Sequence, residues 1–98
     1  MDTPKYNPTT LTVAVDWIHV REAERRGANG NRAVTPFTLA LVEQSRFSSG
    51  RVTDEAVIFI DYDGHQVRFP PCQLLQEYLA ARLRGESPQP ARFTLERA

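Results

Sequence analysis

The clearest pattern along the chain is a pair of hydrophobic segments separated by the dipeptide Asp63-Gly64. β-Branched and aromatic residues are frequent on both sides of it. This combination is typical of a β-hairpin with a two-residue turn, and it predicts strands near 54 to 62 and 65 to 69. Residues that pair directly across a hairpin share one face of the sheet. The face expected to meet the core carries Ile58, Ile60, Tyr62, His65, Val67 and Phe69, and the reverse face carries Val57, Phe59, Asp61, Gln66 and Arg68.

A second alternating segment lies upstream, where Phe37, Leu39 and Leu41 occupy every other position. We expect a strand near 35 to 47, followed by a turn at 48 to 51. With this turn, the hydrophobic sides of the two alternating segments coincide, which supports the pairing. The reverse side of the predicted sheet then keeps a hydrophobic strip made by Ala40, Val42, Val57 and Phe59, with Arg68 at its rim.

The N-terminal part of the chain fits two patterns. Residues 10 to 20 match both a helical stripe and strand alternation, but their many β-branched side chains favour a strand. A single helix over 10 to 26 is the alternative. Residues 21 to 26 are charged and helix-prone, and they form either a helical turn or the outer end of a long ribbon. A glycine-containing and asparagine-containing segment, 27 to 31, then reverses the chain.

The C-terminal part begins with the pair Pro70-Pro71, which ends the hairpin and opens a helix over 72 to 84. Leu75 and Leu79 belong to its hydrophobic stripe and are expected to pack on the face of Ile58 and Ile60. The remaining tail, 86 to 98, is a linker followed by a short strand at 92 to 97, which joins the edge of this sheet or the sheet of a partner chain.

These elements predict an α+β fold. It is an antiparallel β-meander of about four strands, near 10 to 20, 35 to 47, 54 to 62 and 65 to 69, with one C-terminal helix packed on one face and an extra C-terminal strand. The length of 98 residues fits a single domain over 1–98. We expect residues 1 to 8 to be flexible.

Composition and charge exclude several classes of protein. The chain is 41% hydrophobic and 24% charged, as is usual for a globular protein. Twelve basic residues balance twelve acidic ones, so no overall field attracts nucleic acid or an anionic membrane. One cysteine excludes an internal disulfide, and no segment approaches the roughly 18 apolar residues that span a bilayer. We therefore expect a cytoplasmic protein without membrane contact.

Catalytic and metal-binding motifs are missing from the sequence. Asp61, Asp63 and His65 alternate around one turn like the start of a calcium loop, but the later ligands of such a loop are absent. We interpret these residues as a structural turn and expect no metal and no cofactor. Cys72 at the start of a helix is interpreted as a small buried residue and not as a nucleophile. We expect no catalytic residues and no enzymatic activity.

The surfaces left over suggest binding. The favoured hypothesis is a small cytoplasmic protein-interaction module, an adaptor or inhibitor, that forms a homodimer or binds another protein through the strip of Ala40, Val42, Val57, Phe59 and Arg68. The first alternative is nucleic-acid binding by an arginine-rich arm that carries Arg21, Arg25, Arg26 and Arg32. The second is a small-ligand pocket between helix and sheet at Tyr62, His65 and Tyr78.

Overall fold

The computed structural model of the chain describes residues 6–30 and 34–97. Within them it contains three helices and two antiparallel sheets, so the α+β class is confirmed. The strands are β1 (Thr10–Val15), β2 (Phe47–Val52), β3 (Val57–Asp61), β4 (Gln66–Phe69) and β5 (Ala91–Glu96), and the helices are α1 (Trp17–Ala28), α2 (Pro36–Gln44) and α3 (Gln73–Leu83).

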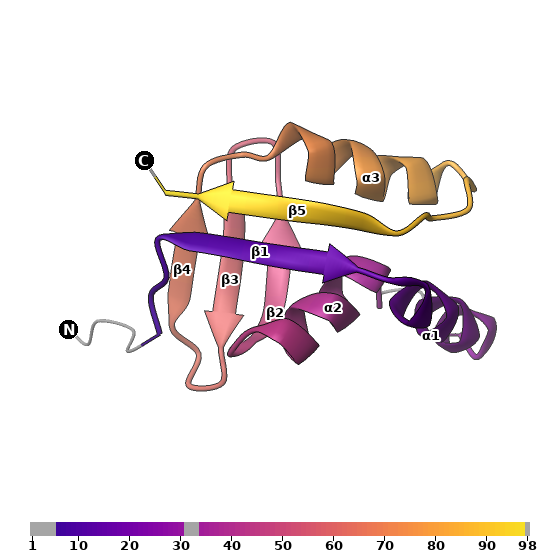
Figure 1. Cartoon of the computed structure of the whole chain (residues 1–98), viewed down its shortest axis with the longest axis horizontal. Coiled ribbons are helices and arrows are strands. Elements are labelled where there is room, and N and C mark those ends of the chain that lie inside the picture. The colour runs from indigo at the N-terminus through magenta and orange to yellow at the C-terminus, as the bar shows by residue number, and fades with distance from the viewer. Residues whose placement is uncertain (1–5, 31–33, 98) are drawn as a thin grey trace.

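The strands form two units instead of the single four-stranded meander predicted. β2, β3 and β4 make a three-stranded meander, while β1 pairs with β5 in a separate ribbon. Figure 1 shows this ribbon crossing one face of the meander, with α3 running along β5 and α2 beside β1. The N–H of Arg97 donates to the carbonyl of Thr9 at 2.9 Å, so the ribbon joins segments from both ends of the described chain.

The core lies between the ribbon and the meander. Phe59 of β3 is fully buried, and its ring centroid lies 4.9 Å from that of Phe47 and 5.4 Å from that of Phe69. Phe37 of α2 contacts Phe59 on one side and Phe93 of β5 on the other. Aromatic packing of this kind fixes the position of α2 against both sheets.

The segment 36–44 is a helix, so the strand expected near 35 to 47 is wrong. Pro36 occupies the first helical turn, where its missing N–H would have no helical partner. The hydroxyl of Thr35 accepts the N–H of Thr38 at 3.0 Å and caps the helix. The buried residues of α2 are Pro36, Phe37, Ala40 and Leu41, which follow helical spacing.

The turn expected at 48 to 51 lies inside strand β2 instead. Gly50 pairs with Phe59 of β3, and a Cβ at this position would lie 3.0 Å from the Phe59 ring. The glycine therefore makes room for a core side chain and does not form a turn. The chain reverses at 53–56, where the N–H of Thr53 donates to the carbonyl of Ala56.

The two strands of the 56–69 hairpin are confirmed, but their register differs by one residue from the prediction. The N–H of Asp61 donates to the carbonyl of His65, so residues 62–64 form a three-residue turn. Val57 then pairs with Phe69, and a shift of one residue exchanges the two faces of a strand. The buried face carries Val57, Phe59, Asp61, Val67 and Phe69, and the outer face carries Ile58, Ile60, Gln66 and Arg68.

The terminal elements follow the predictions in part. The C-terminal helix and the C-terminal strand are confirmed, and β5 pairs with β1 of the same chain. Leu75 of α3 packs into the core that holds Phe59, so the helix lies on the Phe59 face of β3 and not on the face of Ile58 and Ile60 that was expected. The strand expected near 10 to 20 is correct for β1 but wrong beyond it, where α1 begins.

The N-terminal segment expected to be flexible lies only partly within the described residues, because 1–5 fall outside them. Tyr6 is described and is half-buried. Its ring packs against that of Phe47 at 4.8 Å, so this end of the segment is in contact with the core.

Candidate functional site

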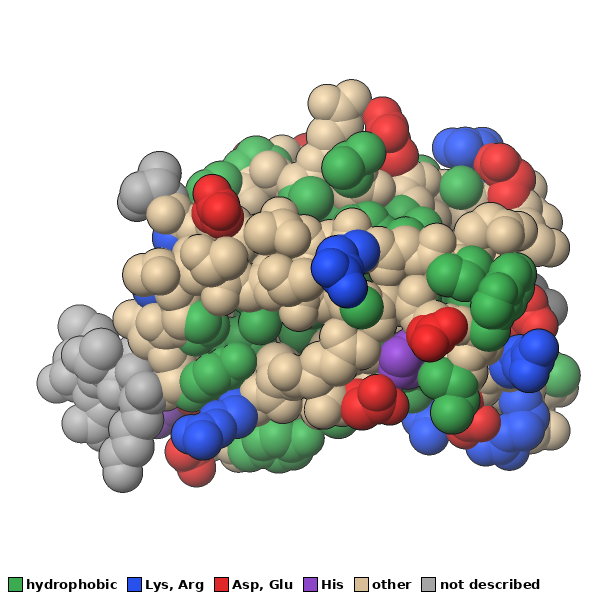
Figure 2. All heavy atoms as spheres, viewed as in Figure 1, with side chains coloured by type: hydrophobic (Ala, Val, Ile, Leu, Met, Phe, Trp, Pro, Cys, Tyr) green, Lys and Arg blue, Asp and Glu red, His purple; other side chains and the backbone are tan. Residues whose placement is uncertain are grey.

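A hollow on the described part of the chain lies between α1 and α2, and we call it the α1–α2 groove. Its volume is about 610 Å³. Figure 2 shows hydrophobic, acidic and basic side chains close together on the part of the surface formed by these helices. The groove is lined by Ile18, His19, Arg21, Glu22, Arg25 and Arg26 of α1 and by Leu39 and Glu43 of α2.

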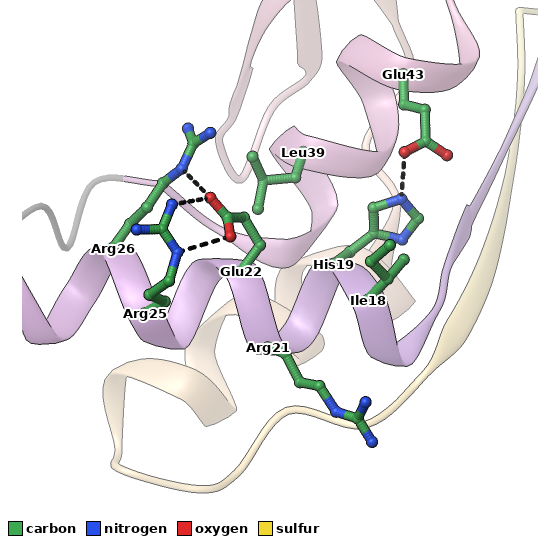
Figure 3. A pocket seen from close by; sticks show the side chains of 8 residues that line it. All are labelled: Ile18, His19, Arg21, Glu22, Arg25, Arg26, Leu39 and Glu43. Carbon is green, nitrogen blue, oxygen red and sulfur yellow. Dashed lines mark hydrogen bonds and ion pairs between the residues drawn. The ribbon is translucent and has the colours of Figure 1, made fainter.

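A carboxylate with two guanidinium partners occupies one end of the groove. Glu22 accepts two hydrogen bonds from Arg25 and one from the Nε of Arg26, at 2.9 Å (Figure 3). The three residues are spaced by three and four positions on α1, so they lie on the same face of the helix. The hydrogen bonds from Arg25 and Arg26 lower the pKa of Glu22 to about 2, which keeps this carboxylate ionised at neutral pH.

A histidine and a second carboxylate occupy the other end. His19 is buried; its Nδ1 accepts the N–H of Asp16 at 2.9 Å, and its Nε2 lies 3.2 Å from a carboxylate oxygen of Glu43. A backbone N–H can only donate, so Nδ1 carries no proton and Nε2–H donates to Glu43. The same ring completes the capping box of Asp16 at the start of α1 and links α1 to α2.

Two hydrophobic side chains also line the groove, one near each charged end. Figure 3 shows Leu39 of α2 facing Glu22 of α1, with Ile18 next to His19. Ile18 is 67% exposed and Leu39 is half-buried. Val42 lies one helical turn beyond Leu39 and is also exposed. The groove therefore combines exposed hydrophobic surface with a basic end and an acidic end.

The hairpin residues proposed as a turn form a second polar cluster. Ligand atoms of Asp61, Asp63 and His65 lie within 4.8 Å of one another. One oxygen of the buried Asp61 accepts the N–H groups of Asp63 and His65, both at 2.9 Å, and the other lies 3.3 Å from the His65 ring. Burial alone would raise the pKa of Asp61, but these hydrogen bonds and the His65 ring outweigh it and lower the pKa. The absence of a metal here stays a prediction.

The arginines predicted to form an arm lie on a helix. Arg21, Arg25 and Arg26 belong to α1, and Arg32 lies outside the described residues. Figure 3 shows Arg21 pointing away from the Glu22 cluster. Arg21 therefore lies on a different side of α1 from Arg25 and Arg26. Arg25 and Arg26 both donate hydrogen bonds to Glu22, so the three arginines do not form one basic surface.

The residues predicted as a protein interface are not brought together. Ala40, Val57 and Phe59 are fully buried, because the one-residue shift of the hairpin and the helical form of α2 turn them into the core. Val42 is exposed on α2, and Arg68 is exposed on the outer face of the meander. The prediction of an exposed hydrophobic strip is therefore wrong, because the residues at its centre belong to the core.

The residues predicted as a ligand pocket lie in two places. Tyr62 and His65 belong to the β3–β4 turn, and Figure 1 shows this turn at the end of the meander away from α3. Tyr78 of α3 packs against Phe93, and its hydroxyl donates to the carbonyl of Gln89 at 2.8 Å. Burial raises the pKa of Tyr78, which keeps the hydroxyl protonated as a donor. These three side chains therefore do not enclose one pocket between helix and sheet.

Five residues of the groove were missed from the sequence: Ile18, His19, Glu22, Leu39 and Glu43. The signal for Glu22 was its spacing of three and four residues from Arg25 and Arg26, which is typical of ion pairs on a helix. Leu39 and Glu43 come from a segment interpreted as a strand, so their position against α1 had no signal.

Comparison with family models, curated proteins and solved structures found no match for this chain. Among the described residues, each helix is too short or too polar to cross a membrane.

Proposed function

We propose that this chain is a non-enzymatic protein-interaction module that binds a hydrophobic segment of a partner protein in the α1–α2 groove. The observation that carries this proposal is that the exposed Ile18 and the half-buried Leu39 line one hollow of about 610 Å³ with charged side chains at both ends. A hydrophobic centre with a polar rim is the usual composition of a protein interface.

The shape of the groove favours a peptide segment over an enclosed small molecule. Small-molecule sites bury most of the ligand surface, whereas Ile18 is two-thirds exposed at the edge of this groove. An extended or helical segment can contact such a surface over its whole length. A hydrophobic side chain inserted beside Leu39 would bury the surface that is now exposed to water.

The histidine of the groove supports a binding role over catalysis. Both ring nitrogens of His19 are engaged, Nδ1 by the N–H of Asp16 and Nε2 by Glu43. A general base needs a nitrogen within hydrogen-bond reach of a substrate proton. His19 instead holds the start of α1 against α2 and keeps the two walls of the groove in place.

Two other predictions remain, with less support. Homodimerisation through the sheet would now use the outer face of the meander, where Ile58 and Ile60 are partly exposed and Ile58 pairs with Arg51 on one side and Arg68 on the other. Like charges on this face oppose its pairing with a copy of itself. Nucleic-acid binding would use α1, where Arg25 and Arg26 already share one carboxylate.

The proposal is tested by panning a library of random 12-residue peptides on the full chain. We expect enriched peptides to bind at least tenfold more weakly to Ile18→Asp, because a charge in the hydrophobic centre of a contact must be desolvated. Leu74→Asp is the matched control. Leu74 is 69% exposed and is the second residue of α3, as Ile18 is of α1, and an acidic residue is tolerated at both positions near a helix N-terminus.

Three results would contradict the proposal. Failure to enrich any peptide would remove it, as would equal effects of Ile18→Asp and Leu74→Asp on the enriched peptides. Light scattering over a range of concentrations provides the third, since a dimer abolished by Ile18→Asp would show that a second copy of the chain occupies the groove.

A further inference from the structure

We infer that the partner segment carries a carboxylate beside its hydrophobic anchor, and that Arg25 and Arg26, held in place by Glu22, bind this carboxylate. The inference rests on the proposed function and names the chemistry that the partner must have. It makes Glu22 a positioning residue and the two arginines the contact residues.

The hydrogen-bonding capacity of the arginines is only partly used. A guanidinium carries five N–H donors and no acceptor. Toward the described residues, Arg25 uses two of its donors and Arg26 uses one, all to Glu22. The remaining donors belong to side chains that are 63% and 43% exposed, respectively, so an anion from solution can reach them.

Glu22 places the two guanidinium groups next to each other. Without it, two adjacent positive charges would repel, and each long side chain would sample many rotamers. One oxygen of Glu22 accepts hydrogen bonds from both arginines, so the pair is ordered before a ligand arrives. Ordering in advance lowers the entropy lost on binding, and planar guanidinium groups match the geometry of a carboxylate.

The position of the pair links the carboxylate to a hydrophobic anchor. Figure 3 shows Leu39 lying next to Glu22 and its arginine partners, with Ile18 and His19 one turn away along α1. A ligand whose hydrophobic group contacts Leu39 can therefore reach Arg25 and Arg26 with a neighbouring carboxylate. The opposite end carries Glu43, which would repel a second anion placed there.

The charge balance favours a protein carboxylate over the phosphates of nucleic acid. Two arginines and Glu22 sum to one positive charge, which matches one carboxylate. Nucleic-acid binding relies on several cations that neutralise successive phosphates, and Arg21 points away from this cluster. The chain as a whole has a net charge of zero.

The test uses two small probes that differ only in the carboxylate. N-acetyl-leucine and N-acetyl-leucine amide have the same hydrophobic side chain, and each is titrated into the isotope-labelled full chain while the amide and arginine Nε–H signals are followed by NMR. We expect N-acetyl-leucine to bind about fivefold more tightly than the amide, with shifts at Arg25 and Arg26. Inorganic phosphate alone should shift the same arginine signals more weakly, because it lacks the hydrophobic group.

Variants separate the contact residues from the positioning residue. Arg25→Gln should abolish the preference for the acid over the amide, and Glu22→Gln should reduce it while both arginines remain. Arg84→Gln is the matched control, because Arg84 is 64% exposed and also pairs with a carboxylate, that of Glu86. It should leave the preference unchanged.

Each outcome bears on the inference. Equal binding of acid and amide, or no shifts with either probe, would overturn the carboxylate site, and the peptide panning would still decide the proposed function by itself. Binding of a single-stranded 12-nucleotide DNA is measured for comparison. If it binds the native chain and Ile18→Asp equally well but binds Arg25→Gln more weakly, the site is one for nucleic acid and the inference is wrong. Loss of the preference in Arg84→Gln would show that the effect is one of total charge.

Discussion

Glu22 of α1 and Asp61 of the β3–β4 turn are both carboxylates that accept several hydrogen bonds, but their donors differ. Glu22 accepts from the side chains of Arg25 and Arg26, which extend into solvent. Asp61 accepts from the backbone of its own turn. Both carboxylates have a lowered pKa. The comparison teaches that two carboxylates with a lowered pKa differ in what they order: Asp61 orders the backbone of its turn, and Glu22 orders two exposed side chains, which we propose as a binding surface.

The largest expected effect on stability comes from Asp61→Ala. Two backbone N–H groups of the turn lose their acceptor, and we expect the melting temperature to fall by about 5 to 10 °C. Asp63→Ala is the control, because Asp63 is exposed and donates its own N–H to Asp61. Thermal unfolding followed by circular dichroism measures both. Equal small changes would show that Asp61 does not hold the turn.

The same carboxylate gives a pH dependence with a defined sign. The pKa of Asp61 is lowered from its ordinary value of 3.8, so its contribution to stability is fully present above about pH 5. It is lost as the pH falls below 3.8 toward the lowered pKa. The native chain should therefore exceed Asp61→Asn in stability at pH 7, and this difference should shrink on acidification. A difference that is constant from pH 7 to pH 3 would contradict the role of the charge.

A smaller effect is expected from Gly64→Ala in the same turn. Gly64 has a φ of 87°, which an alanine adopts only with strain, so we expect a loss of about 1 kcal/mol in the free energy of unfolding. Gly27→Ala in α1 is the matched control. Neither glycine has a heavy atom within 4 Å of an added Cβ, and Gly27 lies in a helix, so alanine there should stabilise by about 0.5 kcal/mol. Urea unfolding distinguishes the two signs.

The smallest effect on stability is expected from Glu22→Gln. Exposed ion pairs on a helix contribute little to folding, so the melting temperature should change by less than about 2 °C. The variant should nevertheless weaken the discrimination between acid and amide probes. A large loss of stability, comparable to that of Asp61→Ala, would show that Glu22 is structural and would remove the contrast between the two carboxylates.

The sequence was sufficient to predict those helices and strands for which the turn or cap residues and the hydrophobic pattern indicate the same element. The proline pair before α3 and its leucine stripe predicted that helix, and the segments around Asp63-Gly64 predicted two strands. The register failed because Asp61 accepts backbone N–H groups and makes a three-residue turn, while the dipeptide suggested a two-residue one. This shift of one residue placed Val57 and Phe59 of β3 in the core and Ile58 and Ile60 on the surface, the reverse of the prediction.

The segment from 35 to 52 shows where the sequence alone was insufficient. Leu39 and Leu41 fit strand alternation, while Phe37, Ala40 and Leu41 fit a helix, and Thr35-Pro36 was the start signal that decides between them. β2 contains Gly50, which looks like a turn residue in the sequence. In the structure it is a strand residue whose missing Cβ leaves room for the Phe59 ring. Because α2 was interpreted as a strand, the groove between two helices could not be foreseen, although Arg25 and Arg26 were recognised as binding candidates.

The most direct test of the α1–α2 groove is an NMR titration of the labelled full chain with a peptide enriched by panning. The account predicts that the largest changes in backbone amide shifts lie in α1 and α2, around Ile18 and Leu39, with little change in α3. Changes centred on the outer face of the meander, at Ile58 and Ile60, or on Leu74 of α3 would contradict it and move the interaction surface away from the groove.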